Sequence, residues 1–177
     1  MDNNGDLYVS DTEKNEVKRW KKGQRDGTIV AAGNGKGNHL NQLDSPTYIF
    51  VDQDYSLYIS DENNHRVMKW MKGAKEGIVV AGGQGEGESL TQLSRPAGVI
   101  VDQLDHVYVA DIRNHQITYW SNGSKDSSIV VGRYGKGEQP NELNCPNGLS
   151  FDRQGNLYVA DQGNHRVQKF CVDSNSN

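Results

Sequence analysis

Residues 156–170 read Asn-Leu-Tyr-Val-Ala-Asp-Gln-Gly-Asn-His-Arg-Val-Gln-Lys-Phe. The same pattern, an apolar run, an aspartate, a polar turn and a second run ending in an aromatic residue, recurs at 106–120, 56–70 and 6–20, always 50 residues apart. Self-similarity at a fixed period is the sequence signature of a repeat architecture. No insertion or deletion disturbs the phase, so one structural unit repeats along the whole chain.

Other positions keep the same register on either side of that stretch: Gly35, Gly85 and Gly135; Leu43, Leu93 and Leu143; Pro46, Pro96 and Pro146; Asp2, Asp52, Asp102 and Asp152. In the last repeat, the runs 147–151, 156–160 and 165–170 are rich in strand-forming residues and are separated by turn residues. Residues 78–81 and 129–131 indicate a fourth strand in the earlier repeats. A four-stranded repeat of this length predicts the blade of a β-propeller, with a β-solenoid as the alternative.

We therefore expect a single all-β domain over residues 1–177, with repeats at approximately 1–44, 45–94, 95–144 and 145–177. The expected strands number three, four, four and three, which makes about three and a half blades, an incomplete propeller. Closed propellers usually have four to eight blades. We expect either that the chain is a piece of a longer protein, or that it closes as an incomplete four-blade ring or pairs its open edges with another copy.

Composition and charge narrow the classes of partner. The net charge of −4 disfavours a nucleic-acid partner, although one basic face on an acidic molecule stays compatible with RNA. Neither a signal peptide nor a run of about 18 apolar residues is visible, so no membrane insertion is expected and the compartment stays open. The spacing of Cys145 and Cys171 matches no zinc motif.

The segment 156–170, with Pro146-Asn147-Gly148-Leu149 upstream, resembles the NHL repeat, which is named for an Asn-His-Leu signature. The resemblance covers essentially the whole chain, and the first repeat departs most, with Asn15-Glu16 where the last has His165-Arg166. It implies a propeller, often six-bladed. Known members include RNA- or protein-binding domains of tripartite-motif ubiquitin ligases, extracellular domains of bacterial kinases, and the peptidyl-amidating lyase. Fold alone does not choose among these functions.

Three histidines, His65, His115 and His165, recur at one repeat position and invite a metal-site interpretation. The expected fold places them on a ring around the propeller axis, two strands out from the innermost. With strands about 4.8 Å apart, the radius of that ring is on the order of 10 Å. The ligands of one zinc ion must each lie about 2 Å from it. We therefore expect these side chains to pack their turns and bond to backbone, and we expect no metal site and no cofactor.

The other repeated residues also indicate architecture. Aspartates that end the second strand of each repeat are expected to bind backbone N–H groups or a nearby arginine: Asp11, Asp61, Asp111 and Asp161. The glycine-rich segments 33–37 and 83–87 resemble phosphate-binding loops, but no helix follows them. Aromatic residues that end the third strands are expected to pack between blades, with base stacking as the alternative: Trp20, Trp70, Trp120 and Phe170. Since catalytic residues normally occur once, no catalytic residue is expected among these.

The remaining information lies where the repeats differ. Around the repeated proline the chain reads Ser45 and Tyr48, then Arg95, then Asn147 at positions that lead into the innermost strands. These positions should line the mouth of the central channel. We predict a ligand-binding surface there formed by Tyr48, Arg95 and Asn147.

The function that fits these observations is a non-enzymatic interaction module that presents a propeller face to a protein or peptide, with RNA as a second class of partner. One alternative is a metal-dependent enzyme resembling the amidating lyase, which would need unique ligands near the axis. The inner-strand positions there are apolar, for example Ile49, Val51 and Val99. Another alternative is the substrate- or RNA-recognition part of a tripartite-motif ubiquitin ligase.

Overall fold

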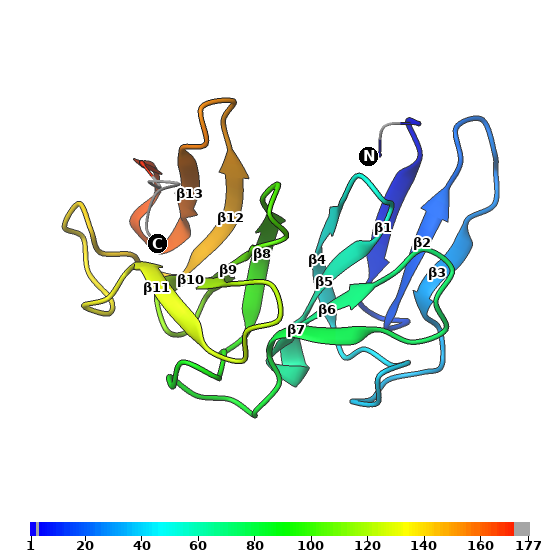
Figure 1. Cartoon of the computed structure of the whole chain (residues 1–177), viewed down its shortest axis with the longest axis horizontal. Coiled ribbons are helices and arrows are strands. Elements are labelled where there is room, and N and C mark those ends of the chain that lie inside the picture. Colours follow the sequence, from blue (N-terminus) through cyan, green and yellow to red (C-terminus); the bar gives the residue numbers. More distant parts are fainter. Residues whose placement is uncertain (3, 172–177) are drawn as a thin grey trace.

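Four antiparallel β-sheets follow one another along an arc in the computed structural model, which describes residues 1, 2 and 4–171 (Figure 1). The sheets contain three, four, four and three strands, which confirms the expected incomplete propeller. The strands are β1 (Leu7–Asp11), β2 (Glu16–Trp20) and β3 (Thr28–Ala32); β4 (Pro46–Val51), β5 (Leu57–Asp61), β6 (Arg66–Trp70) and β7 (Ile78–Gly82); β8 (Pro96–Val101), β9 (Val107–Asp111), β10 (Gln116–Trp120) and β11 (Ser127–Val131); β12 (Pro146–Phe151), β13 (Leu157–Asp161) and β14 (Arg166–Phe170).

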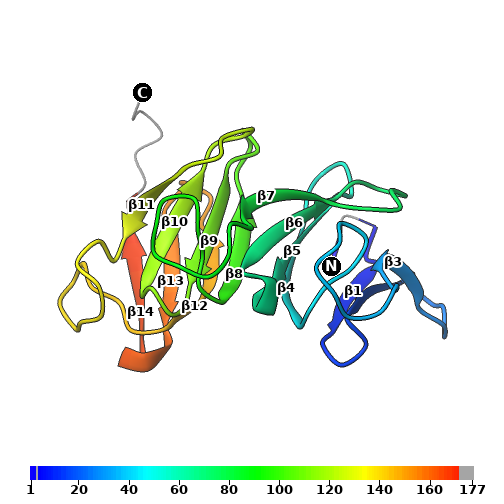
Figure 2. The same ribbon diagram turned by 90° about the horizontal axis from the view of Figure 1, so that it is seen from below.

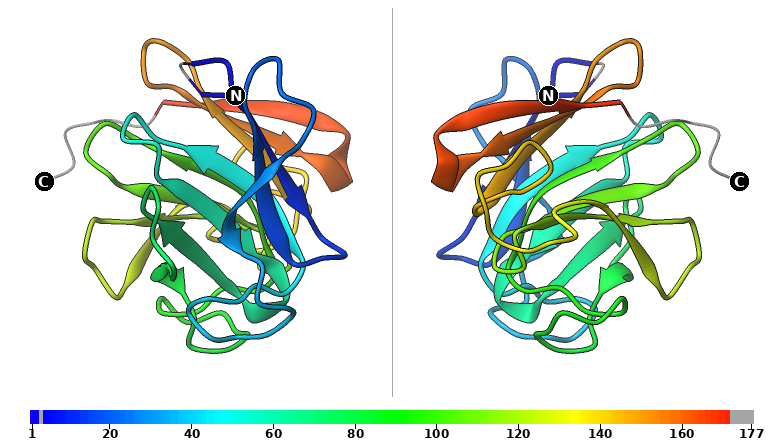
Figure 3. Two further views of the ribbon diagram at one scale, coloured as in Figure 1. Left: turned by 90° about the vertical axis from the view of Figure 1, so that its right-hand side faces the viewer. Right: turned by 90° about the vertical axis from the view of Figure 1, so that its left-hand side faces the viewer.

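Each sheet is a meander, and in the last three sheets the first strand lies innermost, against the first strand of the neighbouring sheet. Strand β8 lies between β4 and β12, and Figure 2 shows the order of the sheets from the first to the last. The first sheet begins with β1, which corresponds to the second strand of the other sheets, and β1 and β14 are edge strands among the described residues. The sheets at the two ends of the arc are toward the viewer in the two views of Figure 3.

The hairpin turn after each innermost strand is closed by the repeated aspartate. In the second sheet, Oδ1 of Asp52 accepts the backbone N–H groups of Asp54 at 2.9 Å and Ser56 at 2.8 Å. These side-chain bonds add to the backbone bonds of the same turn, in which the N–H of Tyr55 donates to the carbonyl of Asp52 and the N–H of Asp52 donates to the carbonyl of Ser56. Short 3₁₀ turns, η1 (Glu62–Asn64) and η2 (Gln162–Asn164), connect the second and third strands of two sheets.

The hydrophobic core is divided into three clusters, one at each junction between adjacent sheets. Trp70 and Trp120 are buried in these clusters, as their repeat position predicts. Leu43, Leu93 and Leu143, on the crossovers between sheets, are fully buried. The apolar side chains of the innermost strands also pack into these junctions. Among the described residues, no helix has the length and apolar character needed to cross a membrane.

Candidate functional site

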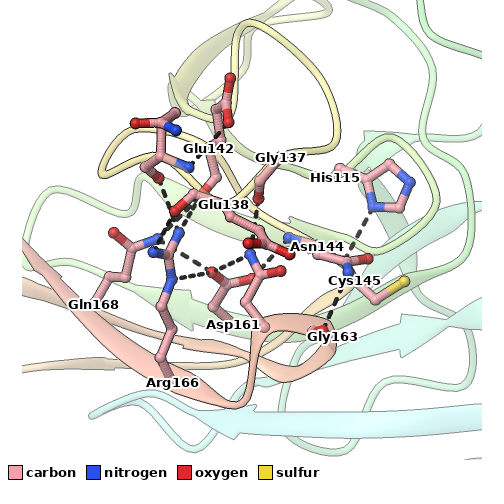
Figure 4. Close-up of polar contacts among 12 residues, drawn as sticks. His115, Gly137, Glu138, Glu142, Asn144, Cys145, Asp161, Gly163, Arg166 and Gln168 are labelled. Atoms are coloured by element: carbon pink, nitrogen blue, oxygen red, sulfur yellow. Dashed lines mark hydrogen bonds and ion pairs between the residues drawn. The ribbon is translucent and has the colours of Figure 1, made fainter.

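At the end of the sheets where the innermost strands begin, the aspartates that end the second strands of the last three sheets bind the crossover that arrives from the preceding sheet: Asp61, Asp111 and Asp161. Figure 4 shows this network around Asp161. Oδ1 of Asp161 accepts the backbone N–H of Asn144 at 2.7 Å, and its Oδ2 accepts Nε of Arg166 at 2.7 Å and Nδ2 of Asn164 at 2.9 Å. Arg166 also donates to the crossover carbonyls of Glu138, Gln139 and Glu142. The aspartate–arginine pair therefore joins one sheet to the loop before it.

The same network occurs around Asp61 and Arg66 in the second sheet. Burial disfavours the charge on Asp161, but the hydrogen bonds from Asn144, Arg166 and Asn164 outweigh burial and lower its pKa. Asp61 has the equivalent partners Asp44, Asn64 and Arg66, but at this site burial outweighs their hydrogen bonds and raises its pKa. These carboxylates are fully engaged in structural contacts, which confirms their expected role as backbone acceptors.

The third sheet departs from this pattern, because Gln116 stands where the other two have arginine. Nε2 of Gln116 donates to Oδ2 of Asp111 at 3.1 Å, so the neutral amide keeps the hydrogen bond without the positive charge. Burial then raises the pKa of Asp111 from its ordinary 3.8 to about 6. A raised pKa at a buried carboxyl is often a sign of a functional group. Here the carboxyl is fully buried and bonded to Ser94 and Asn114, so it has no access to a substrate.

The repeated histidines join adjacent sheets through backbone. Nδ1 of His65 accepts the N–H of Arg95 at 3.2 Å, and Nδ1 of His115 accepts the N–H of Cys145 at 3.0 Å. In the first sheet Oδ1 of Asn15 takes the same role toward Ser45, at 2.8 Å. The sequence predicted that these histidines bond to backbone, and the contacts agree for His65 and His115.

The predicted surface at the channel mouth is only partly assembled as expected. The hydroxyl of Tyr48, on β4, hydrogen-bonds Oδ1 of Asn147, on β12, although the two strands belong to sheets separated by β8. Nδ2 of Asn147 donates to Oε1 of Gln162 at 2.9 Å. Tyr48 is 38% exposed, which leaves its ring available at the surface. The structure thus brings two of the three predicted residues together and adds Gln162.

Arg95, the third predicted residue, is held by the turn of the second sheet. Its Nε forms an ion pair with Oε1 of Glu62 at 2.9 Å, and its Nη2 donates to Oδ1 of Asn63 at 3.1 Å. Both side chains of the ion pair are partly exposed, so this pair orients the guanidinium more than it stabilises the fold. We call Tyr48, Glu62, Arg95, Asn147 and Gln162 the mouth surface.

Sequence reasoning missed Glu62 and Gln162. Both follow the repeated aspartate directly, and this position reads Thr12, Glu62, Ile112 and Gln162 along the chain. The signal was therefore present in the sequence. The repeats differ at this turn just as they differ around the proline, and comparing them at the turn would have identified both residues. The register pairs Pro46 with Asp61 and Pro146 with Asp161, which places this turn beside the start of the innermost strand.

Gly98 allows strands β8 and β12 to lie close together. A Cβ atom at this position would collide with the backbone carbonyl oxygen of Asn147. Strand β8 therefore approaches β12 at Gly98 more closely than a residue with a Cβ atom would permit. The glycine is a packing requirement and not a requirement for left-handed backbone.

A metal centre of the kind the lyase alternative requires does not fit the residues present. Within residues 1, 2 and 4–171, no three histidine, cysteine, aspartate or glutamate side chains gather where they could hold a metal ion. Cys145 and Cys171 are both free thiols in the structure. The chemistry that the mouth surface offers is hydrogen bonding, one ion pair and an exposed aromatic ring.

The chain is similar to one known repeat family and to several solved structures. The model of the NHL repeat matches residues 93–118 and 143–170. A chain of a nidogen–laminin complex shares 19% identity at a TM-score of 0.69, over 95% of this chain and 57% of that one. A Bacteroides thetaiotaomicron protein of unknown function shares 18% identity at 0.69, over 93% of this chain and 44% of that one. Streptogramin B lyase shares 11% identity at a TM-score of 0.60, over 99% of this chain and 54% of that one.

These likenesses establish the fold and not the activity. The chain spans about half the length of the solved structures it matches, and none of the three exceeds 19% identity. The comparison with curated proteins gave no match.

Proposed function

This chain carries NHL repeats that fold as blades of an incomplete β-propeller, and from that premise we propose that it is a non-enzymatic module whose mouth surface binds an extended peptide segment of a protein partner. The observation that carries the proposal is the pairing of Tyr48 with Asn147 across β8. This pairing presents an exposed aromatic ring, fixed by a hydrogen bond, at the end of the sheets where the innermost strands begin.

The composition of the mouth surface supports a peptide. Tyrosine and arginine are enriched among the residues that dominate protein–protein binding energies. Here the ring of Tyr48 and the guanidinium of Arg95 are both held in place by partners, Asn147 and Glu62, before any ligand binds. Binding groups that are already ordered lose less conformational entropy on association.

The charge of the surface favours a peptide over RNA. Arg95 is neutralised by Glu62, and the chain as a whole carries a net charge of −4. Phosphate binding depends on uncompensated lysine and arginine, and most of its affinity comes from them. Asn147 and Gln162 instead offer amide donors and acceptors that match the backbone of an extended chain.

Peptide binding is supported by the pairing of Tyr48 with Asn147, and no comparable contact among the described residues supports the enzyme alternative. Streptogramin B lyase and a protein described as a putative gluconolactonase are structural neighbours, but at 11% and 16% identity they support the fold alone. Each buried aspartate of the repeat is occupied by structural partners. We therefore assign the chain no catalytic residue in this proposal.

The proposal is tested by selecting peptides from a random phage-displayed library on the immobilised chain and measuring the Kd of the selected peptides by fluorescence polarisation. Tyr48→Ala, Arg95→Ala and Asn147→Ala should each weaken binding by about tenfold or more, which is about 1.4 kcal/mol. Leu104→Ala is the matched control, because Leu104 is 70% exposed at the opposite end of the sheets.

Peptides that bind all three variants as tightly as the wild type would contradict the proposal, as would the failure of any peptide to be enriched. A single-stranded RNA oligonucleotide serves as a second probe. If it bound more tightly than every selected peptide, and if Arg95→Ala removed that binding, the partner class would be RNA instead.

A further inference from the structure

The chain contains asparagine residues that are directly followed by glycine at four places: Asn4, Asn34, Asn122 and Asn147. An asparagine side chain loses its amide spontaneously when the backbone nitrogen of the next residue attacks its Cγ atom. Glycine in the next position favours this attack, because it has no side chain to obstruct the approach and it leaves the backbone free to move. By this criterion alone the four pairs are equivalent, and the structure distinguishes them.

Asn147 is held most firmly of the four. It lies in strand β12, its Oδ1 accepts the hydroxyl of Tyr48, and its Nδ2 donates to Oε1 of Gln162 at 2.9 Å. Both atoms of the amide must give up these partners before Cγ can turn toward the backbone nitrogen of Gly148. The strand must also open locally, which costs free energy in a packed sheet.

Asn4 and Asn34 are each held by a hydrogen bond from the side-chain amide. Nδ2 of Asn4 donates to the hydroxyl of Tyr55 at 3.0 Å, and the N–H of Gly5 is itself bonded to a backbone carbonyl. Nδ2 of Asn34 donates to the carbonyl of Asn41 at 3.0 Å. In both pairs, at least one hydrogen bond must break before the nitrogen can attack Cγ.

Asn122 lies in the turn at residues 121–126, between β10 and β11, where every residue is exposed. Within the part of the chain that the structure describes, neither the side-chain amide of Asn122 nor the N–H of Gly123 has a hydrogen-bond partner. The nearby hydroxyl of Ser124 is engaged with the backbone of Asp126 instead, at 2.9 and 3.2 Å. A Cβ atom at Gly123 would have no neighbour within 4 Å, so the approach to its nitrogen is open.

We propose that Asn122 is a site of spontaneous deamidation, at which the folded chain acquires aspartate and isoaspartate while the other three Asn-Gly pairs keep their amides. The N–H of Gly123 loses its proton to hydroxide, and the nitrogen bonds to Cγ of Asn122. The bond from Cγ to Nδ2 breaks, and Nδ2 takes a proton from water and leaves as ammonia. Water then opens the cyclic imide at one of its two carbonyls, which gives aspartate or isoaspartate.

The modified turn lies at the end of the sheets opposite the mouth surface. Trp120, the last residue of β10, pairs with Val107 at that end, whereas Gln116, the first, pairs with Asp111 beside the mouth. Deamidation adds a negative charge to the turn, and isoaspartate also lengthens its main chain by one carbon atom. Because Asn122 is remote from the mouth surface, the inference goes beyond the peptide-binding proposal and stands whether or not a peptide binds.

The experiment incubates the folded chain in neutral to mildly alkaline buffer and samples it over time. Each sample is digested briefly at mildly acid pH, where the reaction is slow, and mass spectrometry measures the amide content of each Asn-Gly pair. We expect deamidation at Asn122 to be faster than at Asn147 by about tenfold or more, which corresponds to about 1.4 kcal/mol of activation free energy. The rate at Asn122 should rise in proportion to hydroxide concentration, because the attacking nitrogen must lose its proton.

Unfolding the chain in guanidinium chloride separates the effect of structure from that of sequence. There the four pairs should deamidate at similar rates, because no hydrogen bond restrains any of them. Asn122→Lys is the matched variant, since Lys22 and Lys72 occupy this position in the equivalent turns. It should melt like the wild type and lose the fast reaction.

Three results would overturn the proposal. In the folded chain, Asn122 could react no faster than Asn147, or another of the four pairs could react faster than Asn122. A preference for Asn122 that persisted unchanged in guanidinium chloride would show that the flanking sequence, and not the structure, sets the rate.

Discussion

Nδ1 of His115 accepts the backbone N–H of Cys145 at 3.0 Å and so joins the turn of the third sheet to the first residue of the fourth repeat. Cys145 has a φ of 50°, in the left-handed region that a non-glycine residue rarely occupies. The equivalent residues Ser45 and Arg95 have the same conformation and the same kind of side-chain acceptor. The hydrogen bond holds the strained residue in place at each junction.

Two substitutions at His115 should therefore distinguish the hydrogen bond that its Nδ1 accepts from the packing of its ring. Asn15 already performs this role toward Ser45, so His115→Asn should keep the bond and most of the stability. His115→Ala should lose about 1–2 kcal/mol of unfolding free energy, because the N–H of Cys145 loses its partner. Urea denaturation of the three proteins measures the difference, and equal losses for both variants would argue against the assigned role.

The same histidine should contribute to the pH dependence of stability. Burial and then Lys136 lower the pKa of His115 below its ordinary 6.5, and the neutral ring is the form that accepts the hydrogen bond. A lowered histidine pKa means that the unfolded chain binds the proton more readily. The stability from His115 is therefore present above pH 6.5 and lost as the pH falls below it. His115→Asn should remove this part of the acid sensitivity in urea melts between about pH 5 and pH 8.

Asp111 should change the pH dependence of stability in the direction opposite to His115. Because its pKa is raised from 3.8 to about 6, the folded state binds its proton more tightly than the unfolded state does. Its contribution is most favourable below pH 4 and is lost as the pH rises through 6. Gln116→Arg should supply the charge that Arg66 gives Asp61, lower the pKa of Asp111 and stabilise the fold near pH 7 by about 1 kcal/mol.

The gain from Gln116→Arg should disappear below about pH 4, where Asp111 is protonated in both the folded and the unfolded chain. Arg66→Gln is the reverse change at the equivalent junction, and it should destabilise the chain at pH 7. Nuclear magnetic resonance titration of the Asp111 carboxyl carbon measures the pKa directly. An unchanged pKa in Gln116→Arg would show that the missing arginine is not the reason for the shift.

Gly98 and Gly148 provide a matched pair for the packing at the channel mouth. Gly98→Ala should destabilise the chain by about 1–3 kcal/mol, since its Cβ meets the carbonyl of Asn147 and the strands must separate. Gly148→Ala should be nearly neutral, because its Cβ would lie 3.5 Å from Cβ of Ala160, an ordinary contact. Thermal melts of the two variants test this, and a neutral Gly98→Ala would contradict the close approach of β8 and β12.

Most of the fold was predictable because the repeat supplies many independent copies of the same signal. The strand count of three, four, four and three follows from the 50-residue spacing of Asp61, Asp111 and Asp161. The observed strand ends differ from the predicted ones by only a residue or two, as at Pro146. The site was less predictable. Contacts such as that of Tyr48 with Asn147 join sheets two apart, and they depend on how closely the strands approach, which no single repeat encodes.

The contacts of Arg95 were also only partly predictable from the sequence. Its difference from Ser45 and Cys145 marked it as a candidate, but the ion pair with Glu62 depends on the turn of the preceding sheet. Sequence periodicity locates such turns without giving the direction of their side chains.

Peptide binding at the mouth surface is tested by adding a selected peptide to isotope-labelled chain and following the amide shifts by two-dimensional nuclear magnetic resonance. We expect the largest shifts at Tyr48, Arg95, Asn147 and the turn at Gln162. Shifts confined to the opposite turns, at residues 52–56 and 102–106, would contradict it and would move the binding surface to the other end of the sheets.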